Sequence, residues 1–142
     1  MTAAAERVPV VDYRRQLGRI RSAKLAKDDH GCISLTLQFE FGGSSQAFAP
    51  VLYSPIWPSR SGEDGNHLAQ ARIVGAAAAW DLLYSILELF EVESVEELNG
   101  QVAYALRDED GFSEYIRGIE RIEADGGAKF HLGDWRKKWG LD

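Results

Sequence analysis

Arginine is the residue type in this sequence with the clearest chemical implication. Eleven of the 16 basic residues are Arg, and the planar guanidinium group can bind two phosphate oxygens at once. The bias favours a phosphate-containing ligand, although coding DNA rich in G and C would produce it equally well. The formal net charge of −6 argues against a broad surface for duplex nucleic acid or for an anionic membrane. A small anion bound in a local basic pocket is compatible with it.

Catalytic and metal-binding patterns are weak by comparison. Cys32 is the sole cysteine, lies in a predicted strand and lacks the flanking sequence of a nucleophile. His30, His67 and His131 are scattered, whereas a zinc site needs ligands at short spacing, and His30 fits a turn better. No Walker A, dinucleotide-binding or EF-hand pattern is found. We therefore expect no catalytic activity, no metal and no cofactor.

The segment 41–48, with the sequence FGGSSQAF, either holds a phosphate or simply turns the chain. Gly42 and Gly43 offer backbone N–H groups, but neither a helix N-terminus nor a lysine follows at the spacing of a phosphate-binding loop. We therefore predict a hairpin that shapes the rim of a pocket. Replacing Gly43 with valine is then expected to harm folding more than ligand binding.

The residues on both sides of this segment are predicted to form strands. Residues 33–41 alternate apolar and polar side chains, which is typical of a strand with one buried face. A strand over 18–27 precedes them, and residues 29–31 supply a hairpin turn. The stretch 45–54 again fits a strand, and Pro50 places it at a sheet edge or a bend.

One helix is predicted over 67–90, because apolar side chains recur there at spacings of three and four. The members of this stripe are Ala76, Trp80, Leu83, Leu87 and Phe90, and Leu82, Ile86 and Leu89 widen it. Residues 75–79 have very small side chains, so another backbone can approach closely, either the protein's own sheet or the same helix in a second subunit. Arg72 lies just before them, where a cation needs a charged partner such as Asp81, a glutamate or a ligand.

The last third of the chain returns to strands. Residues 101–108 and 114–125 alternate in the same way, while Ser94 and Glu97 have the spacing of a capping box that opens a short helix. Residues 126–140 form a short amphipathic stretch.

The domain organisation follows from these patterns. Residues 1–17 show no clear period and are predicted to be a loosely ordered arm, whereas 18–142 form one domain. No segment approaches the roughly 20 apolar residues that span a bilayer, and no signal peptide is recognisable. We therefore expect a cytosolic protein.

The order of these features resembles a known family. DDHG before an alternating strand, GGSSQAF, VESVEELNG, IRGI and KFHLGDW follow one another between residues 18 and 135. This set is similar to the first-described type of phage Thoeris anti-defence protein, which sequesters cyclic nucleotide signals. The sequence departs from the family where Ala49 and Pro50 replace glycines and where Tyr104 stands in place of a frequent Arg, so that Arg107 is the nearest guanidinium.

The resemblance implies an α+β fold in which an antiparallel sheet packs against one long helix, with short helices in addition. It implies a homo-oligomer, either a dimer or a hexamer, in the cytoplasm of the bacterial host. The expected ligand is the cyclic ADP-ribose signal made by TIR-domain enzymes, and for some members a cyclic di- or trinucleotide. Binding without cleavage would block Thoeris or CBASS defence.

The family binds adenine with side chains of the helix region and phosphates with Arg on neighbouring elements. Carried to this sequence, the predicted ligand-binding residues are Arg72, Ala76, Trp80, Tyr84, Tyr104, Arg107, Gln46, Phe48 and His131. Core packing is the alternative role for each aromatic residue in this set. At the level of function, the alternative is a small phage protein whose acidic face inhibits a host defence protein by direct binding.

Overall fold

The computed structural model describes residues 14–53, 65–109, 115–123 and 127–140, with the backbone alone for 65–74. Its elements are β1 (Arg15–Lys27), β2 (Ile33–Glu40), β3 (Ser45–Phe48), β4 (Val51–Tyr53), α1 (Gly65–Leu89), the 3₁₀ helix η2 (Val95–Leu98), β5 (Val102–Leu106), β6 (Gly118–Arg121), β7 (Lys129–His131) and α2 (Leu132–Trp139). No helix in the described part of the chain is both long and apolar enough to cross a membrane.

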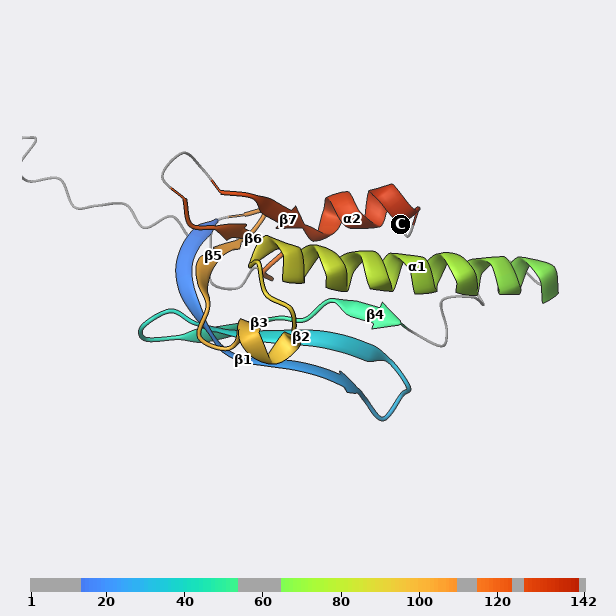
Figure 1. The fold of residues 1–142 in the computed structure, drawn as a ribbon, viewed down its shortest axis with the longest axis horizontal. Helices are drawn as coiled ribbons and strands as arrows, with labels where there is room; N and C mark the ends of the chain where they lie inside the picture. The colour runs from blue at the N-terminus through green and yellow to red at the C-terminus, as the bar shows by residue number, and fades with distance from the viewer. Residues whose placement is uncertain (1–13, 54–64, 110–114, 124–126, 141–142) are drawn as a thin grey trace, which may run out of the picture.

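The described strands form one antiparallel sheet in the order β3-β2-β1-β5-β6-β7, and β4 also pairs with β2. This arrangement confirms the predicted α+β class. In Figure 1, β1 curves from the hairpin below α1 to the strands above it, so the sheet wraps around the helix. A register shift between Ile20 and Ser22 is the type of irregularity that bends a strand.

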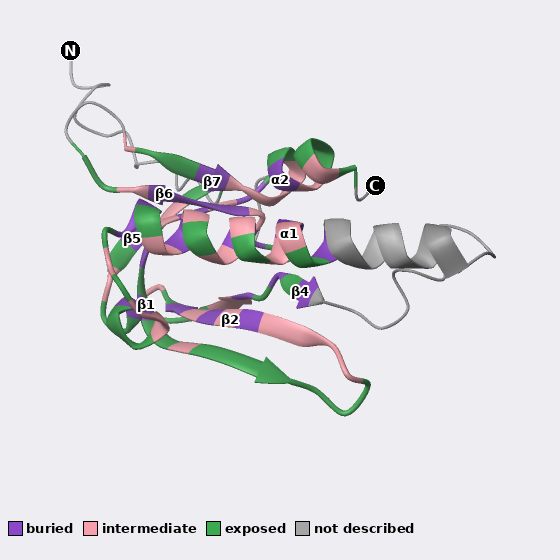
Figure 2. Ribbon diagram, turned by 45° about the vertical axis from the view of Figure 1, so that its right-hand side comes forward, coloured by how far each residue is buried: buried purple, intermediate pink, exposed green. Residues whose placement is uncertain are grey.

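The core lies between the concave face of the sheet and α1. Leu35, Leu37 and Phe39 are fully buried, as the period of two in β2 predicted. Ile20 of β1 lies beside Phe39, and Phe48 of β3 lies beside Leu37. Figure 2 shows buried and exposed turns alternating along α1, which is the pattern of a helix with one face against a sheet.

The buried stripe of α1 agrees with the predicted one except at its start. Leu82, Ile86, Leu89 and Phe90 are buried as predicted, whereas Ala78 is fully buried and Trp80 is 71% exposed. Trp80 lies about 200° around the helix from Ala78, so the two residues cannot share a face. The prediction was wrong for Trp80 because a spacing pattern this rich in apolar residues fits more than one face.

The helix α2 packs against the small residues of α1 in the same chain. The indole Nε1 of Trp135 donates a hydrogen bond to the carbonyl oxygen of Ala78 at 2.8 Å. One turn further, Asp81 accepts hydrogen bonds from Trp139 Nε1 at 2.7 Å and from Lys138 Nζ at 3.2 Å. The C-terminal helix therefore approaches residues 75–79, a contact that was not predicted, while α1 also packs against β4 of the sheet.

Both predicted turns next to β2 are present. Asp28 Oδ1 accepts the N–H groups of His30 and Cys32 at 2.8 and 3.0 Å, which closes the turn between β1 and β2. Between β2 and β3, Gly42 has a φ of 92°, which disfavours any residue with a side chain. A Cβ atom on Gly43 would meet no atom within 4 Å. A substitution that harms folding is therefore expected at Gly42, and not at Gly43 as the sequence predicted.

Two local predictions need correction. The predicted capping box is incomplete, because the side chain of Ser94 forms no cap. Glu97 Oε2 instead accepts the N–H of Glu93 at 2.7 Å. The strand β1 begins at Arg15, inside the stretch predicted to be a loose arm, because Arg15 pairs with Leu106 of β5.

A buried carboxylate ties the start of β1 to β6. Glu120 is 3% exposed, and its two carboxylate oxygens accept hydrogen bonds from Arg15 Nε at 3.0 Å and Arg15 Nη2 at 3.2 Å. The Arg15 guanidinium also lies 3.8 Å from the ring centroid of Tyr104. The hydrogen bonds from Arg15 lower the pKa of Glu120.

Replacing Arg15 with methionine is expected to lower the free energy of unfolding at pH 7 by about 1–3 kcal/mol, because a buried carboxylate loses its donors. The stabilisation is present above the ordinary glutamate pKa of about 4.3 and is lost as the pH falls through the lowered value. Urea denaturation should therefore show the largest deficit at pH 7 and a smaller one at pH 3. Arg19→Met, an exposed change on the same face of β1, is the control; an equal deficit in both variants would contradict the assignment.

Candidate functional site

Arg107 is a buried cation directly after β5. It is 5% exposed. Its Nε and Nη2 atoms donate hydrogen bonds to Gln46 Oε1, with a length of 3.2 Å for the bond from Nε. Its Nη1 atom donates to Gln16 Oε1 at 2.9 Å. Burial lowers the pKa of the guanidinium group. Two side-chain amides, on β3 and β1, thus hold the guanidinium in one orientation.

The alternation of the strands explains why these residues meet. Ala103 and Ala105 are fully buried. Arg107 follows Ala105 by two positions, so its side chain points to the same, concave face of the sheet. Gln46 lies beside Phe39 on that same face. The polar cluster is therefore the continuation of the core at the end of the sheet, where a buried cation needs hydrogen-bond acceptors.

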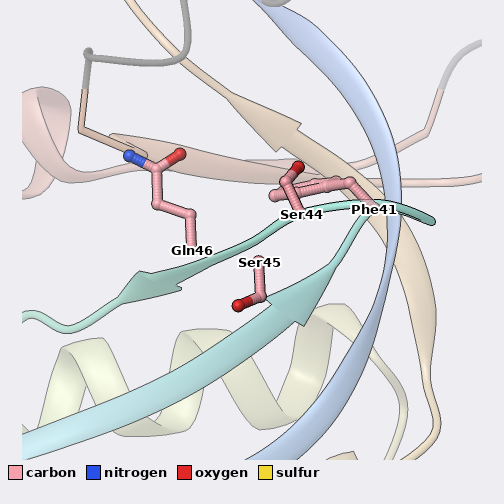
Figure 3. A pocket seen from close by; sticks show the side chains of 4 residues that line it. All are labelled: Phe41, Ser44, Ser45 and Gln46. Atoms are coloured by element: carbon pink, nitrogen blue, oxygen red, sulfur yellow. The ribbon is translucent and has the colours of Figure 1, made fainter.

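The first of two cavities around this cluster lies at the β2–β3 hairpin. It has a volume of about 220 Å³ and is lined by Phe41, Ser44, Ser45 and Gln46. Figure 3 shows these side chains around the hairpin, with Ser44 and Gln46 pointing to the opposite side from Ser45. The hairpin predicted to shape the rim of a pocket does line one.

The second cavity has a volume of about 380 Å³ and includes Arg107 in its lining. Its lining residues are Arg14, Leu106, Arg107, Lys129, His131 and Asp134. Three of them are cations at neutral pH and one is a carboxylate. On a chain with a net charge of −6, this concentration of cations favours an anionic ligand. Because Arg107 also bonds Gln46, it links the two cavities.

Both ring nitrogens of His131 are engaged in hydrogen bonds. Nδ1 accepts the N–H of Gly133 at 3.0 Å and caps α2. Nε2 lies 2.9 Å from Asp108 Oδ1. Because a backbone N–H can only donate, Nδ1 carries the lone pair and Nε2 carries the proton. In this arrangement His131 orients α2 at the edge of the second cavity.

The structure brings together three of the predicted ligand-binding residues. Gln46 and Arg107 are hydrogen bonded, and Arg107 and His131 line the same cavity. Phe48 lies beneath them in the core, with its ring edge-on to that of Phe130 at a centroid distance of 6.4 Å. Tyr104 is on the opposite face of β5 from Ala105, under the guanidinium of Arg15.

The predicted residues of α1 lie elsewhere. Trp80 and Tyr84 are 71% and 67% exposed, and Ala76 is exposed on the same side of the helix. Their spacing of four residues makes them one stripe along α1, which we call the aromatic stripe. Arg72 lies in the part of α1 whose side chains the structure does not describe.

Among the residues of the candidate site that were not predicted are Arg14, Gln16, Phe41 and Lys129. Phe41 follows Phe39 by two positions, so the strand period already placed it on the concave face. The other three come from β1, the residue before it and β7, and the sequence contains no signal for the pairing that brings these segments to Arg107. Within the described residues, no group of three or more His, Cys, Asp and Glu side chains could hold a metal ion.

Comparisons with models of protein families, with curated proteins and with solved structures give no match for this chain.

The tautomer of His131 can be measured. We expect Nε2 to be protonated and Nδ1 to be unprotonated at neutral pH, because the Gly133 N–H occupies Nδ1. Long-range proton–nitrogen correlation spectra of the folded protein distinguish the two tautomers, and His30, which lies in an exposed turn, serves as an internal comparison. A proton on Nδ1 would contradict the capping hydrogen bond.

Proposed function

We propose that this protein is a non-catalytic sponge that binds a cyclic nucleotide signal, of the cyclic ADP-ribose or cyclic oligonucleotide class, in the cytoplasm of a bacterial host. The observation that carries the proposal is Arg107, a buried guanidinium that two glutamine side chains orient and that lines the cation-rich cavity. Sequestering the signal would block a defence such as Thoeris or CBASS, as the sequence resemblance suggests.

The geometry supports a phosphate ligand in the second cavity. Hydrogen bonds between a guanidinium and a phosphate are charge-assisted and are stronger when they are shielded from water. Arg107 is already oriented by Gln46 and Gln16, so binding costs little side-chain entropy. Arg14 and Lys129 border the same cavity and add attraction for a second phosphate group.

The position of His131 supports binding without turnover. Histidine is the side chain that most often acts as a general base. Here Nδ1 is occupied by the Gly133 N–H and Nε2 by Asp108. In the cavity the cations would bind the phosphates of the ligand. His131 would not act as a base, because both of its ring nitrogens are hydrogen bonded within the protein.

The aromatic stripe supports assembly with a second copy of the chain. Trp80 and Tyr84 expose large rings next to the small side chain of Ala76. Across a two-fold axis, antiparallel helices would place Trp80 of each subunit over Ala76 of the other, so the surface is complementary to itself. Large exposed aromatic residues are also the usual anchors of protein interfaces. The same stripe fits the alternative, direct binding to a host protein.

Ligand binding is tested with a panel of cyclic ADP-ribose isomers, cyclic dinucleotides and cyclic trinucleotides. At least one is expected to raise the melting temperature and to be recovered chemically unchanged after the protein is heated. Arg107→Lys keeps the positive charge but loses the paired N–H donors of the guanidinium group. Calorimetry should therefore show roughly 10- to 150-fold weaker binding, which corresponds to the loss of one charged hydrogen bond. Arg19→Lys is the control and should bind normally.

A panel with no stabilising ligand would contradict the sponge. A ligand returned in altered form would replace it with an enzyme. A host defence protein that co-purifies with the chain and is lost in Trp80→Ser, in the absence of any small-molecule ligand, would favour the alternative of direct inhibition.

Assembly through the aromatic stripe is tested by analytical ultracentrifugation. The wild-type chain is expected to be a dimer or a hexamer, and Trp80→Ser should weaken association about 30-fold or more, as removal of an anchoring aromatic residue does. Tyr115→Ser, a change at a ring that is 78% exposed elsewhere, should leave association unchanged. A monomeric wild-type protein would exclude the homo-oligomer.

A further inference from the structure

We propose that the 220 Å³ cavity at the β2–β3 hairpin binds the nucleobase of the ligand, with the base stacked on Phe41 and its polar edge bound by Ser44 and Gln46. The inference rests on the proposed function, because it assigns the phosphates of the same ligand to Arg107 and the second cavity. It differs from the arrangement that the sequence resemblance implied, in which the helix region holds the base.

The ring of Phe41 is fixed before any ligand binds. It is stacked with that of Phe39, at a centroid distance of 5.9 Å and an interplanar angle of 6°. It also lies over Gly18 of β1, where a Cβ atom would be only 2.6 Å from Phe41 Cε1. Gly18 therefore provides the space that the ring occupies. A preordered aromatic surface favours stacking because little entropy is lost on binding.

The base site and the phosphate site would be neighbours, as the covalent structure of a nucleotide requires. The guanidinium carbon of Arg107 lies over the Phe41 ring, 5.3 Å from its centroid, and the base would stack on the part of the ring that lines the hairpin cavity. Gln46 lines the hairpin cavity and accepts hydrogen bonds from Arg107. An aromatic ring beside a guanidinium is the combination by which proteins bind unpaired nucleotides.

The size and polarity of the hairpin cavity also fit a base. Pockets for whole drug-sized ligands are about 300–1,000 Å³, so a cavity of 220 Å³ suits a single ring system. The hydroxyl of Ser44 and the amide of Gln46 can each donate and accept hydrogen bonds, as the edges of nucleobases do. Trp80 and Tyr84 are not among the described residues that line either cavity.

The test compares a probe that has a base with one that lacks it, by calorimetry with the full chain. ADP and inorganic pyrophosphate carry the same two phosphates, and only ADP has the adenine. In Phe41→Leu, ADP binding should weaken roughly 5- to 150-fold, the usual effect of losing one stacked ring. Pyrophosphate binding should stay within twofold of wild type. Tyr115→Leu, the matched change at an exposed aromatic residue, should alter neither affinity.

Each outcome decides between the two proposals. A wild-type protein that binds pyrophosphate as tightly as ADP, or a Phe41→Leu variant that binds ADP normally or loses both probes equally, overturns the base site and leaves the phosphate site standing. A wild-type protein that binds neither probe overturns both. If Phe41→Leu does not fold, NMR of the wild-type protein decides: the Phe41 ring protons should shift upfield with ADP and not with pyrophosphate, and unchanged shifts with bound ADP would overturn the base site.

Discussion

The rest of this structure depends on the burial of one apolar face of β2. Leu35, Leu37 and Phe39 exclude water only if the sheet is covered on that side, and α1 provides the cover. Because successive side chains alternate in a strand, this requirement also fixes the register of β1 and β3 against β2. That register places Gln46 beside Phe39, and the candidate site is therefore a direct extension of the core.

The curvature of the sheet determines what α1 leaves exposed. With strands below it and α2 above it (Figure 1), the helix is enclosed on the sides of Ala78 and Asp81. Only small side chains allow the indole of Trp135 to reach the Ala78 carbonyl. The opposite side of the helix then carries the aromatic stripe, whose large exposed rings are unusual on a surface without a partner. The same alanine-rich segment thus explains both an internal contact and a proposed external one.

Arg107 connects the fold with the proposed function. A buried guanidinium is costly unless acceptors surround it, and glutamine side chains of two other strands meet that need. The guanidinium lines one cavity and is hydrogen bonded to Gln46, which lines a second cavity of different character. One is lined by an aromatic ring and hydroxyl groups, and the other is rich in cations. A ligand with a base at one end and phosphates at the other fits this pair of environments.

The sequence by itself determined the fold class, most strand positions, the hairpin turns and the existence of one main helix, because these depend on periodicity and on local turn chemistry. The family resemblance also predicted Gln46, Arg107 and His131 as ligand-binding residues, and that role stays a prediction. Only the tertiary structure decided that Ala78 and not Trp80 faces the core, that α2 packs on the alanines of α1, and that Arg14, Gln16, Phe41 and Lys129 lie at the candidate site. These contacts depend on the order and register of the strands, which join residues as far apart in the sequence as Gln16 and Arg107. Long-range pairing is set by the packing of the whole core, and no local pattern in the sequence records it.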